Sequence, residues 1–75
     1  MEQKILNVIA KALDIDVSKI SLETTSNDFE EWDSLGHLSL LMELDNNFDT
    51  VSEKAPQLAS ASTVKEIVDA VIEHT

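Results

Sequence analysis

Hydrophobic residues recur at helical spacing along three stretches of this 75-residue chain. From about Gln3 to Leu13 the apolar side chains share one side of a helical wheel and the polar ones share the other, which predicts an amphipathic helix. A second helix is expected from about Ser34 to Phe48. A last helix is expected after a capping box in which Thr63 and Glu66 satisfy each other's backbone donors, with core-facing residues continuing to the end of the chain.

The second of these helices is apolar on two sides. At about 100° per residue, one stripe covers an arc typical of a core-facing surface and consists of Leu40, Leu41, Leu44 and Phe48. Another stripe, centred about 140° from the first, consists of Leu35, Leu38 and Met42. A small charged protein needs only one such stripe for its core, so the other predicts a surface that contacts a partner. The alternative is that this stripe packs against the neighbouring loop.

The connections between the helices differ in length. Asp14 to Asp33 form a connection of about 20 residues, which is long for a compact domain. The side chains that could pin it to the core are Ile15, Val17, Ile20, Leu22, Phe29 and Trp32. Pro56 is tolerated only in the first turn of a helix, so a short third helix is expected near Ala55 to Ala59. Without an alternating strand pattern, residues 1–75 are expected to form one all-α domain, a small antiparallel four-helix bundle with a long first loop.

Composition narrows the classes of partner. The chain has 15 Asp and Glu against 5 Lys and Arg, and its net charge of -10 argues against nucleic acid or anionic lipid. Basic protein surfaces are the expected complement. There is no cysteine, so disulfides and thiolate metal sites are excluded, and we expect no metal centre. Since no apolar run approaches the roughly 20 residues that cross a bilayer, we expect a cytoplasmic protein without a membrane span. We also expect a monomer.

The candidate chemistry lies at the start of the second helix. Asp33 or Ser34 can cap this helix, because a short oxygen-bearing side chain accepts a hydrogen bond from a first-turn backbone N–H. A Ser-His hydrolase would need a base for Ser34, and His37 is the only nearby histidine. His37 falls on the same side as Leu40, so a partly buried structural histidine is the preferred interpretation. Asp45 to Pro56 does not match a calcium loop, because the expected glycine and final glutamate are absent.

These features in combination resemble the acyl and peptidyl carrier proteins. The resemblance includes Asp33-Ser34-Leu35, the hydrophobic spacing through Phe48, the length, the charge and the flanking helices, and it covers essentially the whole chain. It implies a carrier without catalytic activity of its own. Ser34, between Asp33 and Leu35, would receive 4′-phosphopantetheine from coenzyme A through a phosphopantetheinyl transferase. The added thiol would carry acyl or aminoacyl groups as thioesters to partner enzymes of fatty acid, polyketide or related biosynthesis.

The resemblance also implies two further sets of residues. The surface that docks loading and processing enzymes would comprise Leu35, Leu38, Met42, Glu43 and Asp45. The carboxylates would steer basic faces, or serve as solubilising charge, or both. An acyl chain would be sheltered among Leu40, Leu41, Leu44, Phe48, Val64 and Ile67.

Several residues depart from the pattern of carriers in fatty acid synthesis. Trp32 precedes the Asp-Ser pair. The second helix also has fewer acidic residues on its surface than is usual, because it has Gly36, His37, Ser39 and Asn46 there. A peptidyl or aminoacyl carrier of a nonribosomal or D-alanylation-type pathway is therefore an alternative. The competing class is an unmodified acidic helical interaction module that uses Ser34 only as a cap.

Overall fold

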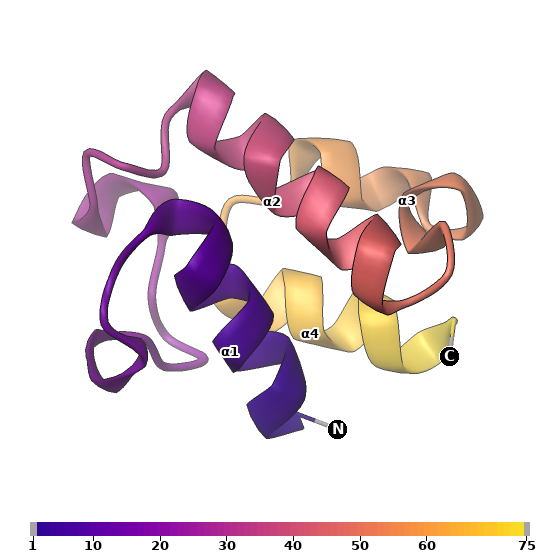
Figure 1. Cartoon of the computed structure of the whole chain (residues 1–75), viewed down its shortest axis with the longest axis horizontal. Coiled ribbons are helices and arrows are strands. Elements are labelled where there is room, and N and C mark those ends of the chain that lie inside the picture. The colour runs from indigo at the N-terminus through magenta and orange to yellow at the C-terminus, as the bar shows by residue number, and fades with distance from the viewer. Residues whose placement is uncertain (1, 75) are drawn as a thin grey trace.

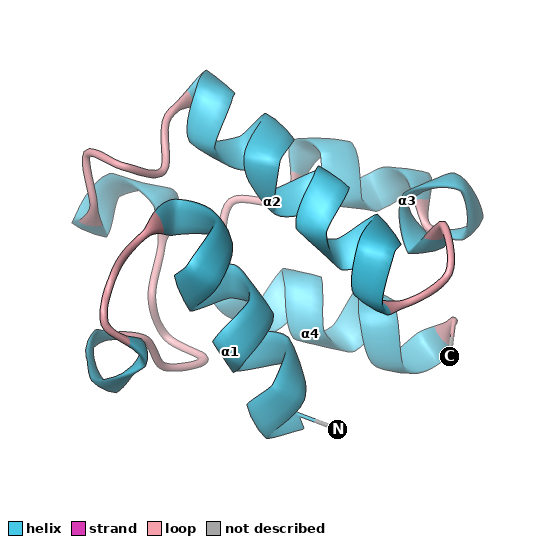
Figure 2. Ribbon diagram, viewed as in Figure 1, coloured by secondary structure: helices cyan, strands magenta, loops and turns pink. Residues whose placement is uncertain are grey.

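A computed structural model describes residues 2–74, which form four α-helices and three short 3-10 segments. In chain order these are α1 (Glu2–Leu13), η1 (Val17–Lys19), η2 (Ser26–Asp28), α2 (Ser34–Asn47), α3 (Val51–Lys54), η3 (Pro56–Ser60) and α4 (Val64–Glu73). Figure 1 shows α2 spanning the molecule above α1 and α4, with the two chain ends on the same side. Figure 2 contains only helices and loops in the described part of the chain, so the all-α prediction is confirmed.

The core forms where α1, α2 and α4 meet. α1 buries its predicted apolar face, including Ile5 and Ile9, against α2 and α4. α4 contributes Val64, Ile67 and Val71, all completely buried. About half of the residues of α1 and of α4 are buried, and together with the buried residues of α2 they enclose one continuous core. Within residues 2–74 there is no helix whose length and apolar content would let it cross a membrane.

The long first loop is pinned by its own side chains, as predicted. Ile20 and Trp32 are buried, and four more residues pack against the core, namely Ile15, Val17, Leu22 and Phe29. The loop is also tied to the start of α4, since the Ser26 N–H donates to the Ser62 carbonyl over 2.8 Å. The Thr24 carbonyl accepts from the Val64 N–H over 2.9 Å. These bonds hold the two connections side by side.

The sequence predicted one short helix near Ala55 to Ala59. This prediction is corrected, because the structure has two short helical segments here. Ala55 leaves the helical region, at φ -127° and ψ 75°, and the residue before a proline is disfavoured in a helix, so α3 ends there and Pro56 starts η3. The helix over Val51–Lys54 was missed in the sequence. Its start has no side-chain cap from Thr50; instead the carboxylate of Asp45 accepts from the Ser52 N–H over 2.8 Å. Each segment inserts one side chain into the core, Val51 from α3 and Leu58 from η3.

The capping box of α4 is confirmed in one half and corrected in the other. The Thr63 hydroxyl oxygen accepts from the Glu66 N–H over 3.1 Å, as expected. The Glu66 carboxylate, however, accepts from the Thr63 hydroxyl over 3.0 Å and not from the Thr63 backbone. The neighbouring Ser62 hydroxyl lies 3.4 Å from the same carboxylate oxygen. The Glu66 carboxylate therefore bonds side-chain hydroxyls, where the capping box expects it to bond the backbone N–H of Thr63.

Candidate functional site

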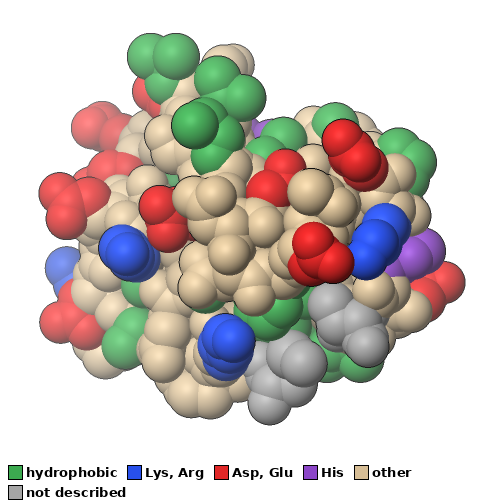
Figure 3. All heavy atoms as spheres, turned by 45° about the vertical axis from the view of Figure 1, so that its right-hand side comes forward, with side chains coloured by type: hydrophobic (Ala, Val, Ile, Leu, Met, Phe, Trp, Pro, Cys, Tyr) green, Lys and Arg blue, Asp and Glu red, His purple; other side chains and the backbone are tan. Residues whose placement is uncertain are grey.

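The two apolar stripes of α2 have opposite environments. Leu40, Leu44 and Phe48 are buried and Leu41 is partly buried, so the first stripe faces the core. Leu35, Leu38 and Met42 are 75%, 54% and 59% exposed. In Figure 3, hydrophobic side chains gather as a raised cluster at the upper edge of the molecule, where α2 begins. The prediction of an apolar surface stripe is confirmed, and the alternative that it packs against the loop is wrong.

Asp33, and not Ser34, supplies the N-cap of α2. Its Oδ1 accepts from the Gly36 N–H over 2.8 Å, while its backbone is extended at φ -94° and ψ -166°. A side-chain acceptor at this position satisfies one of the free N–H groups of the first turn. Ser34 is the first residue of the helix and is exposed. Its hydroxyl is therefore not needed to hold the helix start.

Gly36 lets the loop lie directly on the first turn of α2. A Cβ at this position would collide with the carbonyl oxygen of Glu31 and would lie 3.2 Å from a methyl carbon of Leu13. The obstacle at Glu31 is backbone, which cannot rotate away as a side chain would. Gly36 is the only glycine of the chain. Its φ angle is not positive, so the close approach of Glu31, and not an unusual backbone conformation, explains why a glycine is needed here.

Trp32 and His37 form a hydrogen-bonded connection around Ser34. The Trp32 Nε1–H donates to His37 Nδ1 over 2.9 Å, and His37 Nε2 lies 2.8 Å from the Leu58 carbonyl oxygen. An indole N–H can only donate, so Nδ1 must be the unprotonated nitrogen and Nε2–H must donate to Leu58. Trp32 is buried and His37 half-buried, which confirms the loop anchor and the structural histidine.

An open hollow of about 470 Å³ lies beside Ser34. One side comes from the loop and the start of α2, and the other comes from η3 and the residue after it. The lining residues are Ser26, Trp32, Asp33, Ser34, His37, Ala59, Ser60 and Ala61. Hydroxyls, a carboxylate and an imidazole thus border a space that adjoins the Ser34 side chain. A flexible polar group attached at Ser34 would have room here.

The two carboxylates predicted for docking differ in their surroundings. Glu43 is partly buried and its Oε2 lies 3.9 Å from Lys11 Nζ. Asp45 uses both oxygens on Ser52, accepting from the backbone N–H over 2.8 Å and from the hydroxyl over 2.7 Å. Asp45 therefore has a structural role that the sequence did not indicate. Among residues 2–74 no three His, Asp or Glu side chains converge as a metal site would require.

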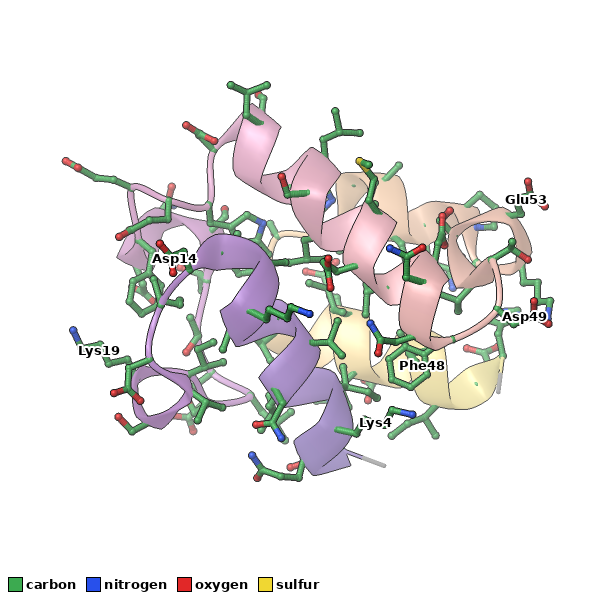
Figure 4. All side chains as sticks on the ribbon, viewed as in Figure 1. Lys4, Asp14, Lys19, Phe48, Asp49 and Glu53 are labelled. Atoms are coloured by element: carbon green, nitrogen blue, oxygen red, sulfur yellow. The ribbon has the colours of Figure 1, made fainter. Side chains whose placement is uncertain are left out.

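The six residues expected to shelter an acyl chain belong to one core. Four are completely buried, namely Leu40, Leu44, Val64 and Ile67, with Phe48 buried and Leu41 partly buried beside them. The Lys4 ammonium lies 5.2 Å from the centre of the Phe48 ring, and the two side chains point toward one another in Figure 4. Neither the hollow beside Ser34 nor a smaller one between α1 and α2 is lined by any of these residues.

Sequence reasoning missed several features of the site, and two of them differ in the signal that they left in the sequence. The close approach of Glu31 to Gly36 left one signal, the placement of the chain's only glycine in a first helical turn. The bond from His37 to Leu58 left none, because the two residues are far apart in sequence and a backbone carbonyl has no sequence signature.

A curated protein from Rubrobacter xylanophilus is similar to this chain and is named acyl carrier protein. The two sequences are 36% identical over 74 residues, an alignment that covers 96% of this chain and 88% of the relative. No protein-family model and no solved structure matches the chain. The chain belongs to the acyl carrier protein family.

Proposed function

We propose that Ser34 carries a covalent 4′-phosphopantetheine arm and that the protein presents acyl groups on it to partner enzymes. The observation that carries this proposal is an exposed serine at the first position of α2 whose helix is already capped by Asp33. The hollow of about 470 Å³ beside it has the space and the polar lining that suit an arm with two amide groups. The family membership supports the same chemistry.

In the proposed modification the Ser34 hydroxyl is the acceptor. Its oxygen attacks the phosphorus of coenzyme A that bears the pantetheine. A new oxygen–phosphorus bond forms, and the pyrophosphate bond breaks to release 3′-phosphoadenosine 5′-phosphate. The serine proton leaves to a base of the transferase. His37 is not available as that base, because its Nδ1 accepts from Trp32 and its Nε2 is bonded to Leu58.

The same occupied imidazole argues against the Ser-His hydrolase. A serine nucleophile needs a base whose free nitrogen reaches its hydroxyl, and the free nitrogen of His37 faces Trp32 instead. We therefore propose a carrier without catalytic activity of its own. Loading and transfer would be carried out by the enzymes that dock to it.

We propose that those enzymes dock on the exposed stripe formed by Leu35, Leu38 and Met42. These side chains begin directly after Ser34 and are more than half exposed. Glu30, Glu31 and Asp33, which come just before the stripe in the chain, are exposed and acidic, so a basic partner face is favoured. Glu43 belongs to the same proposed surface. Asp45 contributes less direct contact, because its oxygens are held by Ser52.

The cargo is proposed to be an acyl group, with an aminoacyl group as the alternative. A long acyl chain would have to enter the core around Leu40, Leu44 and Ile67, which are completely buried. Binding inside the folded state raises the melting temperature. We therefore expect an octanoyl-loaded form to melt above an acetyl-loaded form if the chain is sheltered. Equal melting temperatures would favour a short or aminoacyl cargo held outside.

The first experiment measures intact mass after incubation with coenzyme A and a broad-specificity phosphopantetheinyl transferase. The parent protein should gain one phosphopantetheine mass, and a Ser34→Ala variant should gain none. A folded parent that gains no mass would support the competing class, an unmodified acidic interaction module. Gain of mass by the Ser34→Ala variant would place the modification elsewhere.

A further inference from the structure

We propose that Trp32 and His37 are positioning residues for Ser34 in the transfer of phosphopantetheine, and this inference rests on the proposed function. They lie on either side of Ser34 in the chain, two residues before it and three residues after it. Their rings are joined by the 2.9 Å bond from Nε1 to Nδ1. The peptide that carries Ser34 is therefore closed into a short loop by its own neighbours.

The ring geometry indicates a directed hydrogen bond. The ring planes differ by only 11°, and the centroids are 6.2 Å apart. Rings that are nearly parallel, this far apart and joined through their nitrogens meet edge to edge, so the N–H points at the acceptor lone pair. This contact fixes the orientation of both rings, because rotation of either one breaks the bond.

The second nitrogen of His37 extends the connection to η3. Its bond to the Leu58 carbonyl spans 2.8 Å and joins α2 to a segment 21 residues later in the chain. Trp32 and the Leu58 side chain are both buried, so the two ends of the connection are anchored in the core. The hollow beside Ser34 lies between these same elements. His37 thus sets the spacing between the walls of the hollow.

Two further contacts hold the loop on the first turn of α2. The Asp33 carboxylate accepts from Gly36 N–H, and the Glu31 carbonyl lies where a Cβ of residue 36 would be. The helix that begins with Ser34 is therefore contacted by three consecutive loop residues, Glu31, Trp32 and Asp33. Among them only Trp32 reaches through His37 to another element. This pair is the part of the arrangement that couples Ser34 to η3.

A positioning role has a kinetic signature. Placing a reacting group accurately lowers the barrier of the chemical step, and a misplacement of about 1 Å can cost on the order of a hundredfold in rate. The proposed docking stripe points to solvent and is separate from the Trp32–His37 bond. Loss of that bond should lower kcat for transfer to Ser34 and leave the KM for the carrier unchanged.

The test measures kcat and KM for transfer from coenzyme A by a broad-specificity phosphopantetheinyl transferase. His37→Phe keeps a ring but removes both hydrogen bonds, and Trp32→Phe removes the indole donor together with part of the buried ring. His37→Gln restores an acceptor and a donor on one side chain. The matched control is Val68→Ala, which lowers stability from a buried position on α4 that does not line the hollow.

We expect kcat to fall about tenfold or more in His37→Phe, at unchanged KM, and to recover in part in His37→Gln. Since Trp32 is the only tryptophan, its emission should change in folded His37→Phe as well. The inference is overturned if kcat in His37→Phe falls no further than in Val68→Ala at a matched melting temperature. If His37→Phe does not fold, the same comparison with Trp32→Phe decides. A folded parent that is never modified contradicts the proposed function instead.

Discussion

The two apolar stripes of α2 are built from the same kinds of residue and lie in opposite environments. Leu40 and Leu44 are completely buried, whereas Leu35 and Leu38 on the other side are 75% and 54% exposed. Burying a leucine side chain stabilises a protein by about 1.5–3 kcal/mol, so the exposed stripe gives up several kcal/mol of possible stability. In a domain this small that is a large part of the total. The comparison indicates that one stripe serves the fold, while the other is left exposed for the partner contact proposed above.

The largest expected effect is a loss of stability from a substitution in the buried stripe. Leu44→Ala should lower the free energy of unfolding by about 2–5 kcal/mol, because it removes core contacts and leaves a cavity. The melting temperature should then fall by roughly 10 °C or more. Leu38→Ala is the matched control from the exposed stripe and should change stability by less than about 0.5 kcal/mol. Equal losses in the two variants would show that the stripes do not differ as described.

A smaller loss of stability is expected at the helix start, where the stripes begin. Gly36→Ala would gain about 1 kcal/mol of helix propensity on an exposed helix. Here the added Cβ meets the Glu31 carbonyl, so we expect a net loss of about 1–3 kcal/mol in chemical denaturation. Ser39→Ala on the exposed side of α2 serves as the control and should be neutral or slightly stabilising. A Gly36→Ala variant as stable as the parent would contradict the close approach.

The exposed stripe should matter for binding and not for folding. Leu38→Ser together with Met42→Ser should leave the melting temperature close to that of the parent. The variant should raise KM for phosphopantetheinyl transfer roughly tenfold, which corresponds to about 1.4 kcal/mol of binding free energy lost at the two anchors together. Ile72→Ser, an exposed apolar residue on α4, is the control and should leave KM unchanged. An unchanged KM in the double variant would remove the stripe from the proposed docking surface.

The turn after the buried stripe offers a modest gain in stability. Asp49 and Thr50 both have left-handed backbones, at φ 53° and 57°. This conformation costs a residue with a Cβ about 1–2 kcal/mol, and glycine avoids that cost while losing some entropy on folding. Thr50→Gly should therefore raise stability by about 0.5–1 kcal/mol in thermal unfolding. Glu53→Gly, within α3, should do the opposite, and a loss in both variants would contradict the assigned strain.

The smallest effect is expected in the first loop, away from both stripes. Hydrogen bonds from the backbone and side chain of Ser18, with the charge of Lys19, lower the pKa of Asp16. A carboxyl whose pKa is lower in the folded state adds stability above its unfolded pKa and loses it as pH falls through its folded value. Asp16→Asn should thus flatten the fall in melting temperature below about pH 4. Parallel curves for parent and variant would exclude this contribution.

Local pattern was sufficient for most of the fold. Helices α1, α2 and α4 appear within about a residue of their expected starts, because hydrophobic period and capping residues act within one or two turns. The third helix was only half predicted. Pro56 signalled η3, but α3 depends on a cap from Asp45, seven residues before Ser52, which no local pattern contains.

The candidate site divides in the same way. The capping pair Asp33 and Ser34 and the exposed stripe could be predicted from the sequence, because helix capping and hydrophobic periodicity depend on residues that are close together in the chain. Whether Asp33 or Ser34 supplies the cap was not readable, because both side chains can accept the same bond. The structure assigns it to Asp33, which leaves the Ser34 hydroxyl for other chemistry.

By itself the sequence determined that this chain is an acidic bundle of amphipathic helices with a serine displayed beside an apolar stripe. Those properties follow from residue type and spacing, which act through the backbone over a few residues. Only the tertiary structure decided that Asp45 holds the start of α3 through Ser52, why the single glycine is at position 36, and that His37 joins Trp32 to Leu58. Each of these depends on which distant segments come into contact when the core closes, and a hydrogen bond to a distant carbonyl has no counterpart in local pattern.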